Sequence, residues 1–136
     1  MNGRIVLVCV TAQQSSKQLV MAGKQLAEKW GAALEVVSVI LPEKQASGAD
    51  ASVIEEIHSL TRQAGGEMMI YFSTEPVYTL TAHIGKRKPL TVVTGYPGEN
   101  SNNFIDTLRA LLPDQEISMV NGEQIYSILP RPEAAG

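Results

Sequence analysis

Four short apolar runs, separated by segments of helical period, constrain the fold of this chain more than any other feature. The runs are residues 5–10, 34–41, 68–72 and 90–93. They are rich in β-branched residues and mostly continuous rather than alternating, which is typical of strands buried on both faces. Such strands, joined by helices, need right-handed crossovers and form a parallel sheet. The sequence therefore predicts an α/β protein with a doubly wound parallel sheet.

Four further segments carry the apolar period of amphipathic helices. Their expected first and last boundary residues are Ser15 or Ser16 to Gly31, Asp50 or Ser52 to Gly65, Pro76 to Gly85, and Asn102 or Asn103 to Pro113. In the first helix, the Ser15 or Ser16 hydroxyl is expected to accept a hydrogen bond from the N–H groups of the next turn. In the third, Gly85 is the expected residue just past the helix end.

The pattern changes after the fourth helix. Two β-prone runs, residues 117–120 and 125–129, flank Asn121-Gly122. Asn-Gly between such runs is the strongest short signal of a hairpin, because a type I′ turn requires positive φ at both central positions. We therefore expect a fifth strand that turns back into an antiparallel sixth.

Size, charge and hydropathy limit the class of protein. The 136 residues suit one domain, expected over residues 1–130 with a flexible tail at 131–136. Fourteen acidic against eleven basic side chains give a net charge of −3, so we expect no nucleic-acid partner. No apolar run reaches about 18 residues, and membrane insertion is not expected. The single cysteine, Cys9, excludes an internal disulfide and fits a reducing compartment, the cytoplasm.

The segment after the fourth strand is the most informative place for a ligand. Ligands of open parallel sheets bind beyond the carboxyl ends of the strands. Here Gly95 and Gly98 permit close backbone approach, and Asn100 to Asn103 lead into a helix N-terminus, which can hold an anion. The same residues also suit a tight Tyr-Pro-Gly turn followed by helix caps. Both interpretations remain open from the sequence.

No cluster of residues predicts catalysis or a metal site. A phosphoacceptor receiver domain needs acids after the first and third strands, where this chain has Thr11-Ala12 and Ser73-Thr74. The P-loop and dinucleotide motifs are absent. His58 and His83 fall on helices without a second ligand at i+4. The basic run 86–88 falls at a helix C-terminus, where cations favour the helix dipole, away from the ligand edge.

The N-terminal residues resemble the universal stress protein fold. Over residues 4–40 the resemblance is carried by the strand 4–10, the Ser15-Ser16 pair, the helix segment 22–27 and the stretch 31–37. From there to about residue 120 it rests on the order of the elements and on the glycine loop at Gly95 and Gly98. It is strongest toward the version found in KdpD-type potassium-sensing histidine kinases. This implies a three-layer sheet of order 3-2-1-4-5, of the adenine nucleotide alpha hydrolase-like type. It also implies a frequent dimer through the last strand and, in some members, an adenine nucleotide at the carboxyl edge.

The nucleotide-binding pattern of the family carries over in part. ATP-binding members resemble one another in G-x-x-G, nine residues, then G-[ST] after the fourth strand. Gly95 and Gly98 match the first half, but Leu108 and Arg109 stand where the second glycine and the hydroxyl belong. Thr11-Ala12 replaces the usual acid after the first strand. The resemblance implies a degenerate site for ATP, AMP or another adenine nucleotide, formed by Thr11, Ala12, Val39, Ile40, Gly95, Gly98, Asn100 and Ser101.

These observations together favour a non-catalytic regulatory or ligand-sensing module, linked by the resemblance to KdpD-type potassium or osmotic signalling. It would act as a homodimer on a signalling-protein partner. The alternative is an interaction module without a small ligand, whose hairpin edge pairs with a second copy or another protein. An ATP-hydrolysing stress protein is the third class, and it lacks a base paired to a nucleophile. The expected dimer-edge residues are Ile117, Met119, Ile125 and Ile128.

Overall fold

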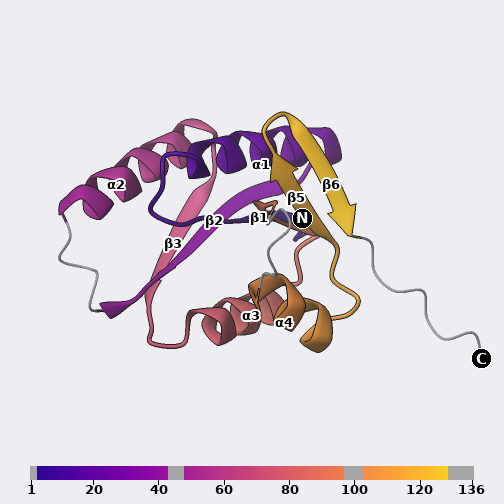
Figure 1. The fold of residues 1–136 in the computed structure, drawn as a ribbon. Coiled ribbons are helices and arrows are strands. Elements are labelled where there is room, and N and C mark those ends of the chain that lie inside the picture. The colour runs from indigo at the N-terminus through magenta and orange to yellow at the C-terminus, as the bar shows by residue number, and fades with distance from the viewer. Residues whose placement is uncertain (1–2, 43–47, 97–102, 129–136) are drawn as a thin grey trace, which may run out of the picture.

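The computed structural model of the protein describes residues 3–42, 48–96 and 103–128, without the side chains of residues 48–50 and 103. Strands and helices alternate along the chain up to the last helix, as expected (Figure 1). In order, they are β1 (Ile5–Cys9), α1 (Ser16–Trp30), β2 (Ala33–Ile40), α2 (Gly48–Gln63), β3 (Glu67–Phe72), α3 (Pro76–Arg87), β4 (Thr91–Gly95), α4 (Asn103–Leu111), β5 (Ile117–Asn121) and β6 (Gln124–Ile128). The expected tail, residues 131–136, lies outside the described residues.

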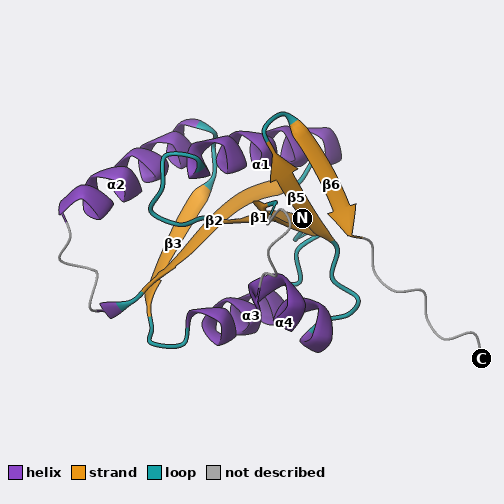
Figure 2. Ribbon diagram, viewed as in Figure 1, coloured by secondary structure: helices purple, strands orange, loops and turns teal. Residues whose placement is uncertain are grey.

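The six strands form one sheet of order β3-β2-β1-β4-β5-β6. All neighbouring pairs are parallel except β5 and β6, which form the antiparallel hairpin. Figure 2 shows α1 and α2 on one face of the sheet and α3 and α4 on the other. This confirms the three-layer, doubly wound α/β fold with an antiparallel last strand. No helix in the described part of the chain is long and apolar enough to cross a membrane.

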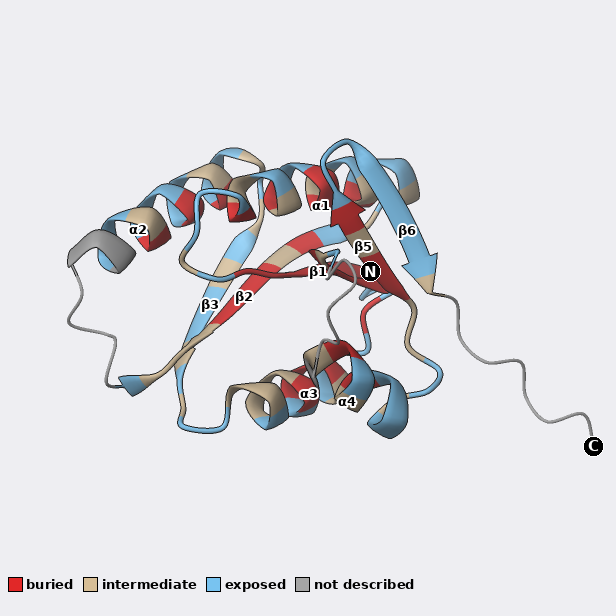
Figure 3. Ribbon diagram, viewed as in Figure 1, coloured by how far each residue is buried: buried red, intermediate tan, exposed pale blue. Residues whose placement is uncertain are grey.

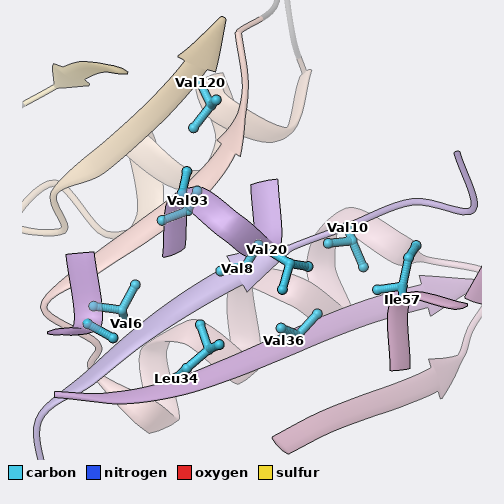
Figure 4. Packing of buried hydrophobic residues seen from close by; sticks show 11 residues of the cluster. Val6, Val8, Val10, Val20, Leu34, Val36, Ile57, Val93 and Val120 are labelled. Atoms are coloured by element: carbon cyan, nitrogen blue, oxygen red, sulfur yellow. The ribbon is translucent and has the colours of Figure 1, made fainter. Parts of the chain in front are cut away.

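The core lies on both faces of β1, where every residue is buried (Figure 3). Side chains alternate between the faces of a strand. Val6 and Val8 therefore pack in the cluster under α1 and α2, and Leu7 packs in the cluster over α3 and α4. Figure 4 shows Val8 close to Val20 of α1 in the first cluster. A strand buried on both faces requires a continuous apolar sequence, which explains the first run.

The third run does not form a doubly buried strand. β3 is the outermost strand of the sheet and pairs with β2. Met69, Ile70 and Phe72 are 46%, 41% and 57% exposed. An apolar run at the edge of a sheet lacks a neighbour on one side, and the sequence pattern does not distinguish it from a central strand.

The helix boundaries differ from the expectations at three places. Ser15 makes no capping hydrogen bond through its side chain, and α1 begins at Ser16. α2 begins at Gly48, ahead of the expected caps at residues 50 and 52. α3 runs through Gly85 and ends at Arg87, with Lys88 in the left-handed region at φ 51°. Lys88 precedes Pro89, and a residue before proline is disfavoured in helical conformation, which explains why the helix ends there.

The hairpin is confirmed, but its turn lies one residue later than expected. Asn121 pairs with Gln124, so Gly122 and Glu123 are the two central residues. Only Gly122 of this pair has positive φ, at 63°. Positive φ at the first central position alone is the pattern of a type II′ turn, which favours glycine there, rather than of type I′.

Candidate functional site

The sheet topology places one switch point at the carboxyl edge, between β1 and β4. From β1 the chain winds outward to β2 and β3, then returns to β4 on the other side of β1. The helices that follow these two strands, α1 after β1 and α4 after β4, lie on opposite faces of the sheet (Figure 2). In open α/β sheets, ligands bind in the crevice at such a point.

A pocket of about 500 Å³ lies at this switch point. We call it the switch-point pocket. Thr11 and Gln13 line it from the loop after β1, Gly95 and Tyr96 from the end of β4, and the hairpin turn contributes Gly122. None of the described residues that line it carries a charge. It therefore suits neutral, hydrogen-bonding parts of a ligand.

A second pocket, of about 650 Å³, adjoins it at the ends of β2 and β3. We call it the apolar pocket. Its lining residues come from the loop after β1, the end of β2, the first half of α2, β3 and the first residue of α3: Thr11, Ala12, Gln13, Ser38, Val39, Ile40, Leu41, Ala51, Ile54, Glu55, Ile70, Phe72 and Pro76. Thr11 and Gln13 line both pockets. A single ligand that bridges the loop after β1 can therefore occupy both.

The Ser16 hydroxyl bridges the loop after β1, which is also held by backbone hydrogen bonds from the Gln13 N–H to the Thr11 carbonyl and from the Ser16 N–H to the Gln13 carbonyl. Ser16 Oγ donates to the Thr11 carbonyl at 2.7 Å and accepts from the Thr11 N–H at 3.1 Å. Ser16 is 2% exposed, so water competes little for these bonds. Ser16 was one of the two serines expected to cap the helix, and its hydroxyl instead bonds the backbone of Thr11 on the other side of the loop. Contacts within the chain therefore shape the wall that the two pockets share.

Gly95 leaves the switch-point pocket open. A Cβ built on Gly95 would meet none of the described atoms within 4 Å. The residue is the last of β4 and is paired with Val120 of β5, so its position is fixed. The next residue, Tyr96, donates its N–H to Val120 and packs its ring on Tyr126, with centroids 5.1 Å apart. The glycine therefore provides space and not a special backbone conformation.

The site is poor in reactive groups. Burial raises the pKa of the Cys9 thiol to about 12, which keeps it protonated and unreactive at neutral pH. Glu55 is the only carboxylate among the described residues of the two linings. Within the described ranges, no group of three or more metal-ligating side chains comes together. The arrangement suits binding through shape and hydrogen bonds.

Five of the expected ligand-binding residues line these pockets. Thr11, Ala12, Val39 and Ile40 line the apolar pocket, and Thr11 and Gly95 line the switch-point pocket. The other three, Gly98, Asn100 and Ser101, lie outside the described residues. Gln13, Tyr96, Phe72 and the hairpin residues Asn121 and Gly122 were not predicted. β5 runs parallel to β4, so its end also reaches the carboxyl edge, and the predicted topology could have indicated the hairpin turn.

The four expected dimer-edge residues are not equivalent. Ile117 is fully buried in the core of the monomer. Met119 and Ile128 are half-buried and pack against the same core cluster. Ile125, on the outermost strand β6, is 38% exposed. Within the set, Ile125 is the residue available to a partner.

A second polar cluster lies on the α3 face, away from the carboxyl edge. His83 is 6% exposed, and its Nδ1 lies 2.9 Å from the Tyr71 hydroxyl. Desolvation lowers the pKa of His83. Arg87 donates to both carboxylate oxygens of Glu35, and this hydrogen bonding raises the pKa of Arg87. His83 is thus a buried histidine with a hydrogen-bond partner, Tyr71. The basic run 86–88 lies at the C-terminal end of α3, as expected.

Comparison with solved structures decides which known fold the chain has. A universal stress protein in complex with cAMP matches at a TM-score of 0.65, with 17% identity over 87% of this chain and 96% of that chain. The chain has the universal stress protein fold. A universal stress protein from Archaeoglobus fulgidus matches at 0.64, with 12% identity over 84% of this chain and 90% of that one. UspA from Lactobacillus plantarum matches at 0.59, with 13% identity over 89% and 99%.

The universal stress protein fold confirms the coarser part of the resemblance stated from residues 4–40. No protein-family model and no curated protein sequence matches the chain. One further structure of this fold, from Archaeoglobus fulgidus, is in complex with dAMP and matches at a TM-score of 0.59 with 14% identity over 84% of this chain and 94% of that one. The closer resemblance to the KdpD-type version stays a prediction.

Proposed function

We propose that the protein is a non-catalytic sensing module that binds an adenine nucleotide across the two pockets. The observation that carries this proposal is that the two pockets adjoin at the carboxyl edge of the sheet, with Thr11 and Gln13 common to both. Proteins of the same fold are in complex with cAMP and dAMP. A nucleotide has one flat, weakly polar part and one hydrophilic part, which correspond to an apolar pocket beside a polar one.

The base occupies the apolar pocket, which Val39 and Ile40 line at the end of β2. The sugar and phosphate extend past Thr11 toward Gly95. A triphosphate carries a large negative charge, and the described lining of the switch-point pocket offers it no cation. A mono- or cyclic phosphate therefore fits better than ATP. Ordering of the loops around the ligand is the signal that a signalling-protein partner reads.

Thermal shift with AMP, cAMP and ATP tests the proposal. A ligand present at 100 times its Kd stabilises the folded state by about 2.7 kcal/mol and raises the Tm by several degrees. Gly95→Val adds a side chain to the lining of the switch-point pocket, at a position where a Cβ meets none of the described atoms within 4 Å, so the unliganded Tm should change little and the shift should vanish. Gly85→Ala, on α3, is the matched control and should keep the shift. Flat curves with all three nucleotides at millimolar concentration would contradict the proposal.

The absence of catalysis is part of this proposal. Hydrolysis of a phosphate ester needs a positioned base, nucleophile or metal. The described pocket residues supply one carboxylate, Glu55, and the only thiol has a pKa raised by burial. We expect no release of phosphate from ATP with or without Mg²⁺. Release that is lost in Gly95→Val would instead show an enzyme.

The proposed setting is a cytoplasmic signalling pathway of the KdpD type. This rests on the sequence resemblance over residues 4–40. A hybrid sensor kinase in which this chain replaces the equivalent domain should retain its response to potassium, and Gly95→Val in the hybrid should weaken that response. A hybrid that folds but has lost the response would contradict this setting while leaving nucleotide binding intact.

A second candidate function is association through the hairpin edge. β6 is an outermost strand, and Ile125 and Tyr126 on it are 38% and 42% exposed. A strand of another protein or of a second copy could extend the sheet there. Ile125→Asp should then abolish the association measured by light scattering. An unchanged mass would remove this candidate.

A further inference from the structure

Two buried hydroxyl groups of the candidate site have no hydrogen-bond partner among the described residues. Eight polar side chains are buried in the described part of the chain, and six of them bond to another side chain or to the backbone: Ser16, Thr61, Thr81, His83, Thr91 and Ser118. The other two are Ser38, which is 1% exposed, and Thr94, which is 8% exposed. A buried hydroxyl without a partner costs free energy, so it contributes nothing to the stability of the fold.

Each of these two hydroxyls belongs to one of the two pockets. Ser38 lines the apolar pocket, and Thr94 lines the switch-point pocket. In the described residues, no side-chain polar atom that is closed to solvent lacks a partner. The Ser38 and Thr94 oxygens are therefore reached from the pockets and are not sealed in the core. Each pocket thus offers a ligand one hydroxyl that bonds to no described residue.

The backbone of β2 places Ser38 at the inner end of the apolar pocket. Val36 packs in the cluster under α1 and α2, and Val37 packs in the cluster over α3 and α4. Because side chains alternate along a strand, Ser38 shares the face of Val36. Ile40, on the same face, lies two residues, or roughly 7 Å, nearer the carboxyl edge and also lines the pocket. The part of a ligand that enters deepest is therefore the part that meets Ser38.

We infer that Ser38 and Thr94 are specificity-determining hydrogen-bond groups of the site: Ser38 binds the exocyclic amino group of the base, and Thr94 binds an oxygen of the sugar or phosphate. The inference rests on the proposed nucleotide binding. In adenine, the amino group lies at the end of the ring system opposite the bond to the sugar. With the sugar directed past Thr11 toward Gly95, that end of the base enters the apolar pocket first and reaches Ser38.

Thr94 lies at the other end of the ligand. It precedes Gly95 in β4 and lines the switch-point pocket together with it. A threonine hydroxyl donates one hydrogen bond and accepts others, so it can bind a sugar hydroxyl or a phosphate oxygen. The described lining of this pocket carries no charge. Hydrogen bonds from groups such as Thr94 therefore take the place of an ion pair.

The inference predicts opposite effects on stability and on affinity. Ser38→Ala and Thr94→Val remove a hydroxyl that bonds to no described residue, so the Tm without ligand should stay the same or rise. Each variant should weaken the binding of AMP about threefold to tenfold, because a hydrogen bond to the ligand is lost. A hydroxyl that serves the fold would show the reverse: a lower Tm and an unchanged affinity.

Thermal unfolding and titration calorimetry with AMP measure these two effects. Each variant has a control at a buried hydroxyl with a partner: Ser118→Ala for Ser38→Ala, and Thr91→Val, on the same strand, for Thr94→Val. Ser118 and Thr91 bond to each other at 2.8 Å, so both controls should lower the Tm by several degrees and keep the wild-type affinity for AMP. Wild-type affinity for AMP in Ser38→Ala or in Thr94→Val would overturn the inference for that residue.

A ligand without the amino group tests what Ser38 contacts. Wild type should bind AMP more tightly than purine riboside monophosphate, which has hydrogen in place of the amino group, and Ser38→Ala should lose most of that preference. Thr94→Val should keep it, because its hydroxyl lies in the other pocket. A preference that survives in Ser38→Ala would overturn the assignment of the amino group. Failure of wild type to bind any nucleotide would refute the proposed function, whereas binding that neither variant weakens would refute this inference alone.

Discussion

Substitution of Gly23 by alanine should destabilise the protein, although alanine favours helices. Gly23 lies in α1 against β1, and a Cβ there would overlap Val8 Cγ2 and lie 3.2 Å from Leu34 Cδ1. Val8 is fully buried in the central strand, and a β-branched side chain has few alternative rotamers. The helix must therefore move away from the sheet.

The magnitude follows from two opposing contributions. Overpacking a core by one methyl group costs about 1–3 kcal/mol. Replacing a helical glycine by alanine gains roughly 0.5–1 kcal/mol. The free energy of unfolding should fall by roughly 1–2 kcal/mol. Gly85→Ala is the matched control, because its Cβ would lie 3.6 Å from Leu112, an ordinary contact, and it should gain about 0.5–1 kcal/mol.

Urea unfolding followed by circular dichroism and by the fluorescence of Trp30, the single tryptophan, measures both effects. A double-mutant cycle with Val8→Ala tests the cause, because removal of the γ-carbons makes room for the new methyl. The coupling between the two sites should be favourable by about 1 kcal/mol or more. Gly23→Ala with wild-type stability, or a cycle that is additive, would refute the packing argument.

Three further predictions concern the turn, a histidine and the thiol. Gly122→Ala should cost about 1 kcal/mol in urea unfolding, because φ is 63° at this position; an unchanged midpoint would contradict the observed turn. Desolvation lowers the pKa of His83, so the unfolded state takes up its proton first as the pH falls below about 6.5, and stability should decline there; His83→Gln should flatten that part of the pH profile. Cys9 should resist a thiol reagent at about pH 8 until urea unfolds the chain, since burial raises its pKa to about 12; rapid reaction of the native protein would show that the strand opens.

The layered fold could be predicted because its signals are local and repeated. β1 needs apolar residues on both sides, and that requirement is visible as the run from Ile5. Gly31 ends α1 with φ 62°, as its place after the last apolar residue indicated. The hairpin followed from Asn121-Gly122, whose neighbours are β-prone. Each of these features depends on a few consecutive residues.

The remaining features depend on distant residues. Nothing near Ile70 in the sequence indicates that β3 is outermost, because strand order is a property of the whole sheet. Ser16 was expected to cap a helix, but its hydroxyl has a partner in Thr11 once the loop folds back. Gln13 and Phe72 enter the candidate site through the packing of α2 over the ends of β2 and β3. Contacts between residues that are far apart in the chain produce no periodic pattern in the sequence, so they could not be predicted from it.

The tie between Ser16 and Thr11 makes this loop a scaffold for redesign. Its shape depends on a side chain inside α1 and on the backbone of Thr11, and not on the side chain of Ala12. Ala12 can therefore be varied while the loop keeps its course, whereas the Gln13 side chain accepts a hydrogen bond from Ser15 Oγ at 3.5 Å. A fold whose recognition residues are decoupled from its architecture in this way can acquire new specificities through single substitutions.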